Sequence, residues 1–235
     1  MNKRSITLLF SIILSSCTKP VQKQEAPVLL DQLPLERYLS ANSAPVFQVD
    51  SQRSQVLVKV RRGGLMAKLG HDHIVSSRQL RGFILMDEVN QRCEADFYIP
   101  LQLLEVDNSE LRKQAQMQTT PSAKDIAGTR INMLKSLEVE QFPMVKLRSA
   151  DCSSAFTNNV VTVEIQLHGV TQKRQITLDW YRDRMGFITL QTEFSLLQTD
   201  FDITPFAIMN GLIAVEDRLE IDVELTAKPL DTTKQ

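Results

Sequence analysis

The sequence lacks the charge imbalance and the catalytic motifs that mark several large classes of protein. With 27 Lys and Arg residues against 28 Asp and Glu residues, its formal net charge is -1, so we expect no basic surface for nucleic acid. It contains no Gly-x-Ser-x-Gly nucleophile elbow, P-loop, Rossmann glycine fingerprint or Cys-x-x-Cys pair. These absences predict a protein that does not bind nucleic acid and is not an enzyme.

The N-terminal apolar run, residues 6–14, is too short to cross a bilayer as a helix. It follows two basic residues and precedes small ones, which is the order of a secretory signal. The tetrapeptide LSSC that ends at Cys17 resembles the bacterial lipoprotein signal, and Thr18 resembles the pattern of lipoproteins sent on to the outer membrane. We therefore expect residues 1–16 to be a lipoprotein signal peptide. The alternative is a plain secreted protein with an incidental cysteine.

The resemblance to lipoproteins implies acylation of Cys17, a membrane anchor, and a location at the periplasmic face of the outer membrane. Residues 17–45 are then the lipidated N-terminus and a polar, Pro-containing tether. Residues 46–230 are expected to form one folded domain, and residues 231–235 a polar tail.

Within the domain, residues 160–172 show the pattern that recurs most often. Apolar side chains alternate with polar ones up to Gly169, so that one face of an extended strand is apolar and the other polar. The same alternation occurs in residues 46–60, 79–86, 93–106, 176–181, 187–197 and 219–226. One-sided strands need a shared interior, which predicts a sandwich or a barrel. Residues 109–137 interrupt the strands with a helical pattern.

Six short motifs then occur in an order that resembles one family. They are FQVD at residues 47–50, LRGF at 80–83, the helical insertion, QFPMV at 141–145, LHGVT at 167–171 and TDFDI at 199–203. From about Phe47 to Pro229 the chain resembles the YceI-like, polyisoprenoid-binding family. The resemblance implies a mostly β fold, an antiparallel lipocalin-like β-barrel with a helical insertion. It also implies an apolar tunnel that binds an isoprenoid-type lipid, such as a polyprenyl lipid or a quinone tail.

Strand alternation predicts which side chains would line such a tunnel. The inward-facing candidates are Phe97, Ile99, Val163, Ile165, Phe194 and Leu196. Phe206 and Ile208 belong to an irregular apolar segment that could line the mouth of the barrel. Alternation does not distinguish a hollow barrel from one filled by side chains, so a structural or partner-binding module is an alternative function.

The three histidines are the candidates for polar recognition. His71 and His73 flank Asp72 in a GHDH segment that departs from the common pattern of the family. These residues could bind the head group of a lipid. With His168, Asp72 or Asp200 as a further donor, they could also hold zinc or copper in a metal- or redox-linked protein. A third reading is a hydrogen-bonded loop that closes one end of the barrel, and strict alternation points His168 away from the interior.

Two cysteines remain once Cys17 is assigned to lipidation. Cys93 falls on the apolar face of its strand, whereas Cys152 falls opposite Val145 and Leu147. This parity disfavours a cross-strand disulfide, although an exported domain would allow one to persist.

Overall fold

The computed structural model describes residues 34–40 and 44–230. The predicted signal peptide, Cys17, the greater part of the tether and the tail at 231–235 therefore lie outside the described residues. No helix in the described part of the chain is long and apolar enough to span a membrane.

Thirteen β-strands, joined in one sheet, are the main regular structure of the described domain. They are β1 (Val46–Val49), β2 (Gln55–Gly63), β3 (His73–Ser77), β4 (Arg81–Asp87), β5 (Arg92–Pro100), β6 (Glu105–Val106), β7 (Met144–Ser149), β8 (Val160–Leu167), β9 (Val170–Thr177), β10 (Asp179–Arg182), β11 (Ile188–Leu197), β12 (Ala207–Ile208) and β13 (Ile213–Pro229). The α-helices are α1 (Leu35–Leu39), α2 (Ser109–Gln114), α3 (Ala123–Ser136) and α4 (Ala155–Asn158). Single 3-10 turns are η2 (Ser51–Arg53), η3 (Ala67–Leu69), η4 (Leu101–Leu103) and η5 (Gln198–Phe201).

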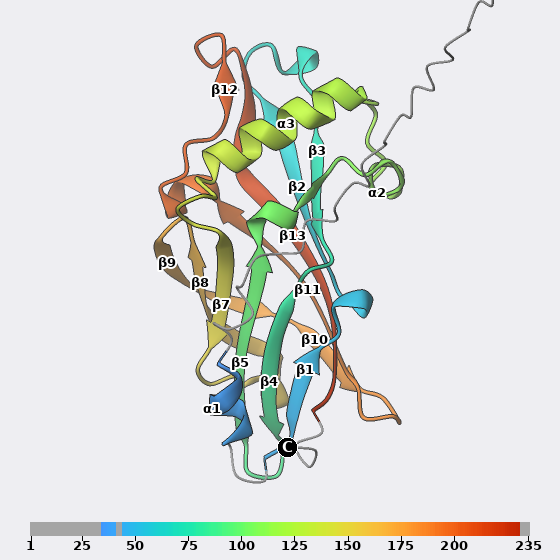
Figure 1. Ribbon diagram of the computed structural model, residues 1–235, viewed down its shortest axis with the longest axis vertical. Helices are drawn as coiled ribbons and strands as arrows, with labels where there is room; N and C mark the ends of the chain where they lie inside the picture. Colours follow the sequence, from blue (N-terminus) through green and yellow to red (C-terminus); the bar gives the residue numbers. More distant parts are fainter. Residues whose placement is uncertain (1–33, 41–43, 231–235) are drawn as a thin grey trace, which may run out of the picture.

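The long strand β13 connects the two halves of the sheet (Figure 1). One edge pairs with β11, from Ile188 opposite Ala227 to Leu197 opposite Arg218. The other edge pairs first with β2 and then with β1, from which the sheet continues through β4, β5, β7, β8 and β9. All of these pairings are antiparallel, as the family resemblance implied.

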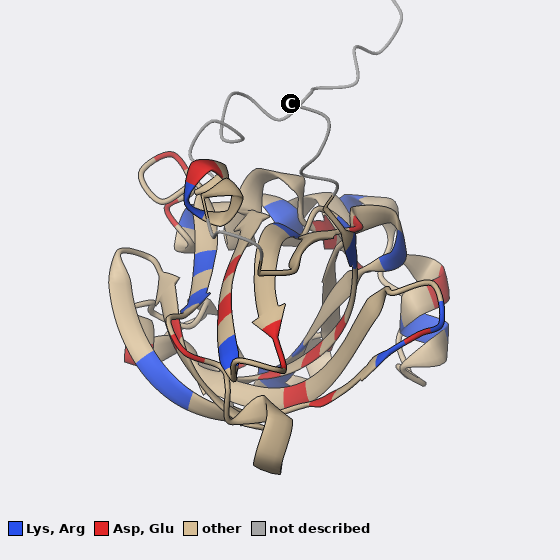
Figure 2. Ribbon diagram, turned by 90° about the horizontal axis from the view of Figure 1, so that it is seen from below, with Lys and Arg blue, Asp and Glu red and all other residues tan. Residues whose placement is uncertain are grey.

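The sheet curves strongly around its apolar face (Figure 2), but no strand ladder joins β9 to β11 among the described residues. The two strands approach each other where the Thr192 hydroxyl donates to the Thr177 carbonyl at 2.7 Å. Beyond Thr177 the chain turns at the buried Leu178, and β10 then pairs with β11. The antiparallel, mostly β fold is confirmed, whereas closure into a lipocalin-like barrel is not.

The predicted helical insertion is present as α2 and α3. The Asn108 side chain, rather than that of Ser109, caps α2 by accepting from two backbone amides. Ser122 and Asp125 form a capping box at the start of α3, and this helix lies across one end of the sheet (Figure 1).

Helix α1 packs at the opposite end of the molecule (Figure 1). Tyr38 is fully buried, and its hydroxyl donates to Asp96 on β5 at 2.7 Å. Arg37 forms ion pairs with Glu94 and Asp96. These contacts fasten the chain that enters the domain to the outside of the sheet.

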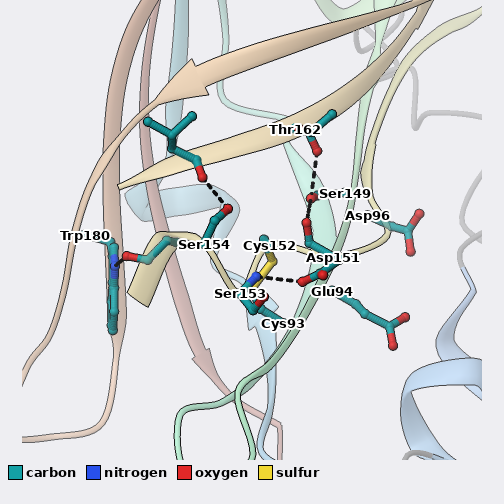
Figure 3. The surroundings of a disulfide bond; sticks show 12 residues. Cys93, Glu94, Asp96, Ser149, Asp151, Cys152, Ser153, Ser154, Thr162 and Trp180 are labelled. Atoms are coloured by element: carbon teal, nitrogen blue, oxygen red, sulfur yellow. Dashed lines mark hydrogen bonds between the residues drawn. A yellow bond between two sulfur atoms is a disulfide. The ribbon is translucent and has the colours of Figure 1, made fainter. Parts of the chain in front are cut away.

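The structure contradicts the expectation that Cys93 and Cys152 stay apart, because they form a disulfide with a Cα–Cα distance of 4.7 Å (Figure 3). Strand β7 ends at Ser149, so strand parity does not apply to Cys152. The Ser149 hydroxyl bonds to the carbonyls of Asp151 and Thr162, and the Cys152 amide donates to the Cys93 carbonyl. The turn at residues 150–153, directly after β7, thereby folds back against Cys93 at the start of β5.

Reducing the disulfide should lower the free energy of unfolding by about 2–4 kcal/mol, because the bond closes a loop of 59 residues in the unfolded chain. Urea unfolding of the oxidised and reduced protein, and of the double variant C93A/C152A, measures the difference. A Cys17→Ser variant serves as the control and should unfold like the wild type. Equal stability of the oxidised and reduced forms would contradict the prediction.

Candidate functional site

An apolar cavity of about 260 Å3 lies inside the curved sheet beneath α3. Its walls come from β2, β13, β7, β8 and β11, and they are built mainly of aliphatic side chains. These include Val56, Val58, Val60, Leu147, Leu167, Leu219, Ile221 and Val223. A second cavity of about 100 Å3 adjoins the first, and Ile99 and Phe194 line both. The second cavity lies toward the disulfide, with Cys93 and Cys152 in its wall.

Eight residues were predicted to line the interior, and seven of them face these cavities. The larger one is lined by Ile99, Ile165, Phe194, Leu196 and Phe206, and the smaller by Phe97 and Val163 together with Ile99 and Phe194. Ile208 is different: its side chain is 45% exposed and lies on neither wall. Strand β12 has only two residues and pairs with β13 alone, so no second layer covers Ile208.

Sequence reasoning missed the contribution of α3 to the cavity. Thr129, Asn132, Met133 and Ser136 face the interior at helical spacing i, i+3, i+4 and i+7. Three of these four side chains are polar, so a search for an apolar stripe does not find them.

The polar side chains of the larger cavity come from α3, from β3 and from the start of η5, directly after β11. They are His73, Thr129, Asn132, Ser136 and Gln198. No Lys, Arg, Asp or Glu lines either cavity within the described residues. The interior therefore combines uncharged hydrogen-bonding groups with a long apolar wall.

His73 is held in place by a buried ionic network that the sequence did not reveal. Its Nδ1 atom lies 2.6 Å from Asp107 Oδ2, and Arg112 Nη1 lies 2.5 Å from Asp107 Oδ1. The Asp107 side chain is 0% exposed and that of Arg112 only 7%. The Ile74 amide also donates to Asp107. This arrangement assigns a proton to Nδ1 of His73, so a neutral imidazole would have an acceptor at Nε2.

The charge state of Asp107 follows from the balance of these contacts. Burial by itself raises the pKa of the carboxyl, but hydrogen bonds from His73, the Ile74 amide and Arg112 outweigh it. The pKa of Asp107 is therefore lowered, and the carboxylate is ionised at neutral pH.

His71 and Asp72 do not face the cavity. The ring centroids of His71 and His73 are 6.3 Å apart, and Asp72 Oδ1 accepts from the Arg62 amide at 3.0 Å. The Asp72 carbonyl accepts from Arg112 at 2.6 Å. Asp72 thus stabilises the turn before β3.

His168 lies in a separate environment, because the chain turns at residues 168 and 169 with φ of 52° and 79°. Its Nδ1 donates to the Phe201 carbonyl at 3.1 Å, and its ring packs on Phe142. Asp200, another candidate metal ligand, pairs with Arg174 at 2.5 Å. Across residues 34–40 and 44–230, no three His, Cys, Asp or Glu side chains are grouped to hold a metal ion.

An Asp107→Asn substitution should lower the free energy of unfolding at pH 7 by about 3 kcal/mol, since it leaves the buried Arg112 without a counter-charge. The folded-state pKa of Asp107 is lowered, so its contribution is present above the unfolded-state value of about 3.9 and is lost as pH falls through the folded value. The difference between wild type and variant should therefore shrink below about pH 4.

Chemical unfolding between pH 7 and pH 3 measures this effect. The exposed Asp179, on β10, provides the matched Asp→Asn control and should change the stability little. A stability difference for Asp107→Asn that does not depend on pH would contradict the assignment.

Comparisons with known proteins agree with this architecture. A family model for the YceI-like domain matches residues 47–227. The crystal structure of BcnA from Burkholderia cenocepacia superimposes with a TM-score of 0.53 at 13% identity, covering 77% of this chain and 99% of BcnA. A polyisoprenoid binding domain from Saccharophagus degradans, implicated in plant cell wall breakdown, gives a TM-score of 0.56 at 14% identity, covering 78% and 98%.

The search of curated proteins found no match. At these identities the two solved structures establish a shared fold. The family model is independent of them and spans well over half of the sequence. The chain therefore belongs to the YceI-like domain family.

Proposed function

We propose that this protein binds the isoprenoid chain of a lipid with an uncharged head group inside its apolar interior. The observation that carries the proposal is the pair of adjoining cavities with aliphatic walls and no charged side chain among their described lining residues. The family and the polyisoprenoid-binding neighbour support the same ligand class. In this proposal the protein acts by binding, or carrying, its ligand and not by catalysis.

The size and shape of the interior suit a chain-like ligand. An apolar cavity of about 150 Å3 in another protein stays dry and binds benzene. The larger cavity here measures about 260 Å3, and the smaller one extends it toward the disulfide. Each methylene group moved from water into such a space contributes about 0.8 kcal/mol. An isoprenoid tail can therefore bind through burial alone.

The polar lining favours an uncharged head group. A phosphate buried among these walls would meet no Lys or Arg on the described lining, and an unpaired buried charge is strongly unfavourable. A carbonyl, as on a quinone, could instead accept from the side-chain amide of Asn132 or Gln198, and a hydroxyl, as on a prenol, could donate to Nε2 of His73. We place the head group near α3 and the tail toward Cys93 and Cys152.

We also propose that the protein is a lipoprotein anchored through Cys17 at the periplasmic face of the outer membrane. The disulfide between Cys93 and Cys152 supports an exported location, because such bonds persist in oxidising compartments. The alternative of a metal- or redox-linked protein has less support, since no three His, Cys, Asp or Glu side chains of the described residues are grouped to hold a metal ion and His71 lies off the cavity wall.

Filling the interior tests the proposal. Val223 lines both cavities, so Val223→Trp should block the passage between them and reduce the bound isoprenoid at least about tenfold, or about 1.4 kcal/mol. Mass spectrometry of lipid extracted from equal amounts of purified protein measures the loss. The exposed Val89 gives the matched control, Val89→Trp, which should keep its lipid. A folded Val223→Trp variant with undiminished lipid would place the ligand elsewhere.

A further inference from the structure

Exposed apolar side chains are concentrated at the end of the molecule that carries α3. Ten large hydrophobic side chains are exposed in the described part, and five of them lie on two loops. The first loop, residues 64–70, follows β2, and the second, residues 208–213, runs from the last residue of β12 through the connecting turn to the first residue of β13 (Figure 1). We call these two loops the apolar tip. Its exposed members are Leu65, Met66, Leu69, Ile208 and Met209.

The two loops of the apolar tip are packed side by side. The Met66 amide donates to the Leu212 carbonyl at 2.8 Å. Gly64 has a φ of 86°, and a Cβ there would stand 2.5 Å from the same carbonyl oxygen, so only glycine permits the approach. The two loops therefore meet backbone to backbone, which brings their exposed side chains to the same end of the molecule.

Five backbone amides of the apolar tip are paired within their own loops. In the first loop the amides of Ala67, Leu69 and Gly70 donate to carbonyls of the same loop. In the second loop the amides of Gly211 and Leu212 donate to Ile208 and Met209. Loops in water can bond to solvent, whereas the hydrocarbon of a bilayer offers no partners. This pairing leaves fewer backbone groups that need water, which favours contact with the boundary region of a bilayer.

Met209 has a backbone conformation in which methionine is rarely found. Its φ is 52° and that of Asn210 is 54°, in the left-handed region where Gly, Asn and Asp are favoured. A methionine there is strained, because in this conformation the Cβ atom comes too close to the following carbonyl oxygen. Its side chain is nevertheless 58% exposed. Folding alone does not account for a large apolar side chain at this position.

The charge of the apolar tip suits an anionic surface. Residues 203–215 contain no charged side chain, and residues 63–70 contain only Lys68. Anionic phospholipids attract such a cation. The apolar tip is also continuous with the cavity, because Phe206 and Val215, which flank the second loop, line its wall.

We propose that the apolar tip inserts into the boundary between head groups and acyl chains of an anionic phospholipid bilayer. The insertion brings the α3 end of the cavity against the membrane, so that an isoprenoid chain exchanges without crossing water. Helix α1 lies at the other end of the molecule (Figure 1), so this contact is distinct from an N-terminal anchor. The exchange rests on the proposed function, whereas the membrane contact does not.

Tryptophan quenching tests the insertion on the full chain. Met209→Trp is mixed with vesicles of brominated phosphatidylcholine and phosphatidylglycerol, and the fluorescence is compared with that on unbrominated vesicles. Insertion by 5–10 Å should quench the added tryptophan about twofold or more. Val89→Trp, which is 91% exposed on the β4–β5 turn, should show only the signal changes of the native Trp180. Changing Lys68→Glu in the Met209→Trp background should weaken the quenching.

Two results would overturn this proposal. One is the absence of quenching for Met209→Trp, and the other is a blue shift that depends on protein concentration without vesicles, which would make a second copy of the chain the partner. The bound isoprenoid is measured separately on the same preparations. A wild type without isoprenoid refutes the proposed function, whatever the quenching shows. Isoprenoid retained by an unquenched Met209→Trp refutes only the membrane contact.

Discussion

The long strand β13 is hydrogen-bonded along both of its edges, to β11 on one side and to β2 and β1 on the other. Its inward side chains Leu219, Ile221 and Val223 face the larger cavity, and the acidic residues between them alternate to the other face. The curvature around this strand sets the width of the interior. Aliphatic side chains of this size do not fill that width, which leaves a space for a ligand.

The two ends of the interior are built differently. The disulfide and Trp180, whose indole donates to the Ala155 carbonyl, border the smaller and wholly apolar cavity. At the other end α3 contributes hydroxyl and amide groups, and Asp107 orients His73. Burying the charges of Asp107 and Arg112 is unfavourable unless they are fully paired, as they are here. This polarity along the cavity gives an amphipathic ligand a preferred direction.

Much of the fold could be predicted from the sequence, because alternation in segments such as residues 160–167 reports directly on one-sided burial. The disulfide was missed because strand parity was extended past the end of β7. Ile208 shares the parity of Phe206 but lies where the sheet has no second layer. Asp107 is 34 positions from His73 and follows a two-residue strand, so no local pattern connects them. The gap between β9 and β11 depends on a turn at Leu178 within a strand-like segment.

The most direct test of the central claim is native mass spectrometry of the full chain purified from its own cells. The account predicts an added mass that is released on denaturation and matches an isoprenoid lipid with an uncharged head group. A bare polypeptide mass, a metal-sized increment removed by a chelator, or a phosphate-bearing lipid would contradict it.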